Sequence, residues 1–187
     1  MSPLEAVTCF SFVGNKEVVI GSMNEEVVKY NYENSPPSQA GSPIAFGAII
    51  NSISVNIAGD KMLVVGDNSA TPVIKVVLYT TSTLVELNEY VMTGKFTNNA
   101  LDGVISDDGN EVYLVGDSVT IQVFDANTPF DAKTSPPDST ENLRSIKLSK
   151  NMLYLIATGQ TKSSFWNRAS TIDVWLAATI PTIDITQ

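Results

Sequence analysis

The sequence predicts an all-β protein made of four similar units. A motif of one strand, a polar turn and a second, more apolar strand occurs four times in the 187 residues. Its second strands carry Gly21, Gly66, Gly116 and Ala157, which lie 45, 50 and 41 residues apart. Amphipathic helix patterns are missing, and β-branched residues alternate with polar ones. A repeat of this length predicts a series of stacked units rather than one packed sheet.

A polar turn separates the first two strands of each unit. Gly, Asn, Asp, Ser and Lys form these turns, and several of them favour positive φ or bonds to their own backbone. We expect strand pairs at 8–13 with 17–22, 52–57 with 62–67, 101–106 with 111–117, and 145–148 with 152–157.

A third strand that ends in an aromatic residue follows in each unit. These strands are expected at 27–32, 73–79, 119–124 and 171–175, and a looser fourth strand is clearest at 83–91 and 181–185. Each unit is therefore predicted to be an antiparallel four-stranded sheet. We expect one domain, with units at about 4–47, 48–97, 98–140 and 141–187.

The units resemble the blades of a β-propeller, and some of their motifs resemble WD repeats. Phe124-Asp125 is similar to the end of a WD repeat, and Trp175 stands in the corresponding place of unit four. The turn at 106–110 resembles that family's Ser-Pro-Asp-Gly turn. The resemblance implies a β-propeller-like fold of four blades. The chain has no His, so that family's Asp-His-Ser/Thr-Trp network cannot form.

Four blades raise a question of closure. The resemblance implies seven or eight blades in most such proteins, and four blades would leave two open sheet faces. Two arrangements remain open. The chain is either a half-propeller that is completed by a second copy or another protein, or a compact four-bladed ring.

Charge and composition disfavour several classes of function. A net charge of −9 repels a phosphate backbone or an anionic membrane surface, so neither nucleic acid nor membrane insertion is expected. The lack of His removes Ser-His and Cys-His nucleophile pairs and the usual zinc ligand. We expect no enzyme, no cofactor and no metal site, and we interpret the Asp-rich turn at 107–110 as a plain hairpin.

The single Cys and the N-terminal residues bear on location. Cys9 lies in an apolar run and is expected to be a small buried hydrophobe. No signal peptide and no membrane-spanning apolar segment are recognised, so the expected location is cytoplasmic. An extracellular or surface-associated protein is the alternative.

Two groups of residues are candidates for partner binding. Asn24, Asp67, Asn68 and Asp117 follow the second strands, and equivalent turns of a propeller lie on one rim. Such a rim could bind a polar ligand or the cations of a partner, although solvated turns contain the same residues.

The second group lies in unit four, in a turn expected at 161–170. The aromatic pair Phe165 and Trp166 stands there between Lys162 and Arg168, an arrangement typical of interface anchors. The alternative is that the two rings fold back onto the adjacent blade.

These observations favour a non-catalytic protein-interaction or structural module that is a subunit of a larger assembly. Its partners would be other proteins or further copies of itself, in a homo- or hetero-oligomer. Two alternatives stay open: a filament or surface-layer protomer, and a propeller-type sugar-binding module or enzyme.

Overall fold

The computed structural model describes residues 6–68, 73–92, 96, 99–128, 131–168 and 175–178 of the chain. These residues form no helix, and their sixteen strands form four antiparallel sheets, which confirms the predicted all-β class. We number the sheets 1 to 4 along the chain.

Each sheet is formed by strands that follow one another in sequence. The strands of sheet 1 are β1 (Val7–Val13), β2 (Glu17–Ser22), β3 (Glu26–Asn31), β4 (Ser38–Gln39) and β5 (Ile44–Ala45). Those of sheet 2 are β6 (Ile49–Val55), β7 (Lys61–Asn68), β8 (Val73–Thr80) and β9 (Glu86–Val91). Those of sheet 3 are β10 (Ala100–Ile105), β11 (Glu111–Gly116) and β12 (Gln122–Asp125). Those of sheet 4 are β13 (Leu143–Leu148), β14 (Tyr154–Gly159), β15 (Ser163–Arg168) and β16 (Trp175–Ala178).

The prediction of four strands in every sheet is right for sheets 2 and 4 and wrong for sheets 1 and 3. In sheet 1, β4 and β5 both pair with β3, and Gly41 and Pro43 lie in the segment between them. In sheet 3, a single bridge from Phe124 to Ala132 stands where a fourth strand was expected. The Pro pair at 136–137 that follows has no backbone N–H for a ladder, which limits pairing there.

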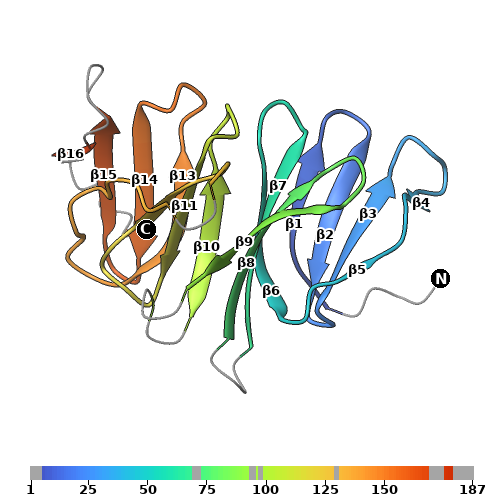
Figure 1. The fold of residues 1–187 in the computed structure, drawn as a ribbon, viewed down its shortest axis with the longest axis horizontal. Coiled ribbons are helices and arrows are strands. Elements are labelled where there is room, and N and C mark those ends of the chain that lie inside the picture. The colour runs from blue at the N-terminus through green and yellow to red at the C-terminus, as the bar shows by residue number, and fades with distance from the viewer. Residues whose placement is uncertain are drawn as a thin grey trace, which may run out of the picture.

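The four sheets lie side by side along the longest axis of the molecule, with sheet 1 in blue at one end and sheet 4 in orange and red at the other (Figure 1). The first strands of successive sheets are neighbours, because β1 contacts β6, β6 contacts β10 and β10 contacts β13. Three sheet-to-sheet contacts result, which we call seams 1, 2 and 3. The side of a sheet that turns toward the preceding sheet is its front face, and the opposite side is its rear face.

The same β-bulge occurs in the first strand of every sheet. It falls at Val7/Cys9, Ile50/Ser52, Ala100/Asp102 and Leu143/Ser145. The ladders on either side of it match the four sheets residue by residue. Ser22, Gly66, Gly116 and Gly159 pair with the residue before the bulge, so the expected equivalence of Gly21 and Ala157 with Gly66 and Gly116 was wrong by one and two residues.

The third strand of unit four differs from the prediction. Residues 163–168 form β15, which pairs with β14, whereas a turn had been expected at 161–170. The predicted third strand at 171–175 is wrong: Trp175 begins the fourth strand, β16, and residues 171–174 lie outside the described part of the chain. Trp166 pairs with Leu155 and so takes the position of Tyr30, Tyr79 and Phe124 in the other sheets. The predicted fourth strand at 181–185 also lies outside the described residues.

Each seam is filled by one apolar cluster, with the rear face of one sheet against the front face of the next. Seam 1 joins the sheet 1 residues Cys9, Val13, Val19 and Val27 to the sheet 2 residues Ile53, Val55, Met62, Val64, Val77 and Tyr79. In seam 2, Leu63, Val65, Val76, Leu78 and Tyr90 meet Ile105, Val112, Leu114 and Phe124. In seam 3, Tyr113, Val115, Ile121 and Val123 meet Ile146, Leu148, Leu155, Ala157 and Trp166.

Cys9 packs against the apolar cluster of seam 1, but it is half-buried rather than buried as predicted. Its thiol is free, and burial raises the pKa of that thiol. The part of the chain that the structure describes contains no helix long and apolar enough to cross a membrane.

Candidate functional site

The front face of sheet 1 is an exposed apolar surface. Phe10 pairs with Ile20 and Phe12 with Val18, and directly opposed residues of antiparallel strands point to the same side of a sheet. Phe10 and Phe12 are 60% and 59% exposed. Their rings meet edge to face at 5.8 Å between centroids, and Tyr32 meets Phe12 in the same way at 5.9 Å. Three aromatic rings therefore form a continuous patch at the end of the molecule.

In the other three sheets the same positions are buried or half-buried. Ile53 and Ile146 are equivalent to Phe10 by register, and they are 8% and 1% exposed. Ile105 is equivalent to Phe12 and is 2% exposed. In each case the preceding sheet covers the side chain. The front face of sheet 1 thus has the composition of a seam without a preceding sheet.

The rear face of sheet 4 is the second open surface. Ile156 pairs with Phe165, and the ring of Tyr154 stacks on Phe165 at 5.5 Å. Ile156 is 39% exposed, whereas its equivalents Val19, Leu63 and Tyr113 are fully buried by the following sheet. Among the described residues, sheet 4 therefore has no following sheet, just as sheet 1 has no preceding one.

The four candidates of unit four do not share one surface. Trp166 is only 2% exposed, and its Nε1 donates to the Pro137 carbonyl at 3.1 Å. Phe165 faces the opposite side of β15, on the open rear face of sheet 4. The Lys162 backbone N–H donates to the Glu141 carboxylate, and Arg168 reaches across seam 3. The prediction of an exposed aromatic loop was wrong because β15 continues the sheet. The alternative of a ring folded onto the adjacent sheet is right for Trp166.

Two of the four polar candidates after the second strands, Asp67 and Asp117, form hydrogen bonds within the protein. Asp67 Oδ2 accepts a hydrogen bond from Asn51 Nδ2 at 2.7 Å, and the same amide donates to the Ala100 carbonyl of sheet 3 at 2.9 Å. The Asp117 N–H donates to the Asn99 carbonyl at 3.2 Å. Asn24 is exposed in the turn between β2 and β3, and the side chain of Asn68 lies outside the description. Partner binding by this rim stays a prediction.

The turn at 106–110 has the geometry of a plain hairpin connection. The Gly109 N–H donates to the Ser106 carbonyl at 2.9 Å, and Gly109 has a positive φ of 71°. The Ser106 hydroxyl donates to Asp108 at 2.6 Å. The described residues contain no group of three or more His, Cys, Asp or Glu side chains that could hold a metal ion.

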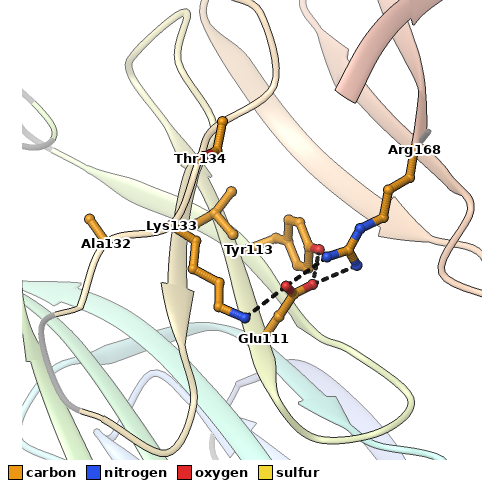
Figure 2. A pocket seen from close by; sticks show the side chains of 7 residues that line it. Glu111, Tyr113, Ala132, Lys133, Thr134 and Arg168 are labelled. Atoms are coloured by element: carbon orange, nitrogen blue, oxygen red, sulfur yellow. Dashed lines mark hydrogen bonds and ion pairs between the residues drawn. The ribbon is translucent and has the colours of Figure 1, made fainter. Parts of the chain in front are cut away.

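A buried charge cluster in seam 3 was not foreseen from the sequence. Arg168 Nη1 and Nη2 donate to the two carboxylate oxygens of Glu111, each at 2.9 Å. Lys133 Nζ donates to the same carboxylate at 2.9 Å, and the Tyr113 hydroxyl also donates to it. Figure 2 shows these side chains around a cavity of about 210 Å³. The signal in the sequence was a single Glu at the start of an otherwise apolar strand.

The environment of Glu111 determines its protonation. Burial by itself opposes ionisation, but hydrogen bonds from Arg168, Tyr113 and Lys133 outweigh it and hold the pKa of Glu111 below its ordinary value. Burial and the neighbouring Glu111 carboxylate raise the pKa of Tyr113. The carboxylate therefore stays ionised and the phenol neutral, so neither is poised to exchange a proton near neutral pH.

This lowered pKa predicts a loss of stability in acid. A carboxyl with a depressed folded-state pKa contributes stability above its unfolded-state pKa, and that contribution is lost as the pH falls through the folded-state pKa. The difference in unfolding free energy between the wild type and Glu111→Gln should shrink as the pH is lowered from about 6 to about 3. Urea unfolding of both proteins across this range measures it. A difference that does not change with pH would contradict the assignment.

Long cations fasten the other seams as well. In seam 1, Lys29 Nζ donates to the Thr81 carbonyl at 3.1 Å and pairs with Glu17 at 3.2 Å. In seam 2, Lys61 Nζ donates to the Gly109 carbonyl at 2.9 Å. Each of the three seams therefore combines an apolar centre with charged or polar contacts between the two sheets.

Comparison with known proteins leaves the geometry as the guide to function. No protein-family model matches this chain, and no curated protein shows significant similarity to it. The two open sheet faces are the surfaces from which a role can be inferred.

Proposed function

We propose that this chain is a non-catalytic structural or protein-interaction module, a propeller-like series of four blades that works as a subunit of a larger β-sheet assembly. The observation that carries the proposal is the exposure of Phe10 and Phe12 at positions that are buried or half-buried wherever a preceding sheet is present. The front face of sheet 1 is the docking surface.

Exposed aromatic side chains make an uncovered face costly. Complete burial of an exposed Phe side chain is favourable by about 1.5–3 kcal/mol. Phe10 and Phe12 are 60% and 59% exposed, so a partner that covers both rings would gain about 2–4 kcal/mol. Contiguous apolar patches on soluble proteins commonly mark interaction sites. A further sheet is the partner that fits, because a sheet covers the equivalent positions in all three seams.

The repeated register supports the propeller-like interpretation. An aromatic ring stands at one equivalent position in every third strand, and in sheet 4 it is Trp166. Trp166-Asn167 is therefore the counterpart of Phe124-Asp125, in place of the predicted Trp175. Sheets 1 and 4 at opposite ends of the molecule favour an open half-propeller over a closed four-bladed ring (Figure 1).

The charge cluster supports a structural role. Glu111 is 5% exposed and binds two cations and a phenol of its own chain. A carboxylate held in this way stabilises a seam and offers little to a substrate.

Removal of the two Phe rings tests the docking surface. We expect the wild-type chain to have a solution mass above the 20.1 kDa of one copy, and the Phe10→Ser/Phe12→Ser variant to have the mass of one copy. Light scattering on a sizing column over a range of concentrations measures this. Ile57→Ser is the matched control, because Ile57 is 65% exposed in a turn of sheet 2, away from the open face.

Binding of the dye anilinonaphthalene sulfonate is a second measurement, which tests the docking surface when the partner is absent from the sample. An uncovered apolar face would bind the dye, and the double variant would lose that binding. A wild type that stays at one copy and binds no more dye than the double variant would refute the docking surface.

A further inference from the structure

We propose that the occupant of the sheet 1 front face is the sheet 4 rear face of a second copy, so that two chains close into one ring of eight sheets. This inference rests on the proposed function and names its partner. It assigns a role to both open faces at once.

The order of the seams supports a second copy. Every seam inside the chain joins a rear face to the front face of the next sheet. The two uncovered faces are one front face and one rear face, at opposite ends of the molecule (Figure 1). A fourth seam of the same kind would continue the series without a new mode of packing. Two copies related by a twofold axis would form two such seams together and leave no end uncovered.

The apolar residues of the two faces match those of the existing seams. In seam 2, Leu63 and Leu78 on a rear face meet Ile105 and Val112 on a front face. By register, Ile156 and Phe165 take the rear positions at the new seam, and Phe12 and Val18 of the second copy take the front positions. The new seam would therefore be aliphatic and aromatic at its centre.

At the proposed seam, two Tyr side chains take the place of the ion pair of seam 3. Glu111 on the rear of sheet 3 binds Arg168 of sheet 4. The equivalent residues at the new seam are Tyr154 and, in the second copy, Tyr32, each 40% exposed. An aromatic pair in place of the ion pair needs no buried charge, which suits a contact between two chains that each carry a net charge of −9.

The first strands can also join in the manner of seam 3. There, the Ile146 N–H donates to Asp102 Oδ2 at 3.0 Å. At the new seam, Ser145 is equivalent to Asp102 and Phe10 is equivalent to Ile146. The Ser145 hydroxyl oxygen of one copy would accept from the Phe10 N–H of the other.

Two single substitutions test the pairing of the faces. Phe12→Asp alters only the front face, and Ile156→Asp alters only the rear face. We expect a wild-type mass of about 40 kDa, twice the 20.1 kDa of one copy, and about 20 kDa for each variant alone. An equimolar mixture of the two variants retains one intact seam, so it should return to about 40 kDa at higher concentration. Circular dichroism checks that each variant is folded, and Ile57→Asp is the control for an added charge.

Each other outcome contradicts a specific part of the proposal: the pairing of the two faces, the closure of the ring, or the docking face itself. If Phe12→Asp is a monomer while Ile156→Asp remains a dimer, sheet 1 docks on a surface other than sheet 4, and the pairing falls while the docking function stands. A mass that continues to rise with concentration indicates an open polymer and refutes ring closure. If neither variant changes the mass of a wild-type dimer, both the pairing of the faces and the docking face are wrong. If the wild type is a monomer that binds the dye through Phe10 and Phe12, a second copy is not the partner, but the docking face stands.

Discussion

Replacement of Glu111 with alanine is expected to lower the free energy of unfolding by about 3–5 kcal/mol, because it removes one side of a buried ion pair. The Glu111 carboxylate accepts two hydrogen bonds from Arg168 and one from Lys133, and the side chain of Glu111 is 7% exposed. Without it, the Arg168 guanidinium would stay in seam 3 and lose its bidentate acceptor. Urea unfolding at neutral pH, followed by circular dichroism, measures the change.

Glu33→Ala is the matched control for this prediction. Glu33 pairs with Lys16 at 3.0 Å, but both side chains are about half exposed or more, so the loss should stay below about 1 kcal/mol. Equal effects of the two substitutions would show that burial of the Glu111 cluster contributes nothing to stability.

The repeat and the first three strands of sheets 1 to 3 could be predicted because their signals are local. The alternation of β-branched residues in the segment at 73–79 needs no knowledge of the rest of the chain, and β8 (Val73–Thr80) matches it. The Asp-Gly turn at 106–110 likewise determines its hairpin through residues that are close in sequence.

The third strand of sheet 4 could not be predicted in this way. Ser163-Ser164-Phe165-Trp166-Asn167-Arg168 contains no β-branched residue, whereas the segment at 171–174 has the composition of a strand. The position of β15 depends on the fit of Trp166 into seam 3, which is a contact between sheets. Strand propensity is strongly modified by such packing, and sequence alone does not contain it.

Two open faces were expected from four blades, but the residues that form them could not be predicted, for a related reason. Both faces of an inner sheet are apolar, so the run at 8–13 has the same appearance as the first strand of any other unit. Only the register, which makes Phe10 the counterpart of Ile53 and Ile146, shows that one face has no cover. Glu111 was missed because its partners Lys133 and Arg168 are distant in sequence.

Trp166→Ala should destabilise the protein by about 3–5 kcal/mol, since it leaves a large cavity in seam 3 and removes the hydrogen bond to Pro137. Trp166→Phe keeps an aromatic ring and should cost clearly less. Phe165→Ala is the matched control, because Phe165 is the next residue on the same strand but points to the open rear face.

The order of these three effects follows from the direction in which each side chain points. If seam 3 holds sheet 4 in place, loss of the Trp166 ring should also weaken any contact made through the rear face, and Trp166→Ala should lower the solution mass at concentrations where Trp166→Phe does not. Thermal and urea unfolding give the stabilities, and light scattering gives the mass. A larger loss of stability in Phe165→Ala than in Trp166→Ala would mean that Phe165, and not Trp166, packs in seam 3. The assignment of front and rear faces in sheet 4 would then have to be reversed.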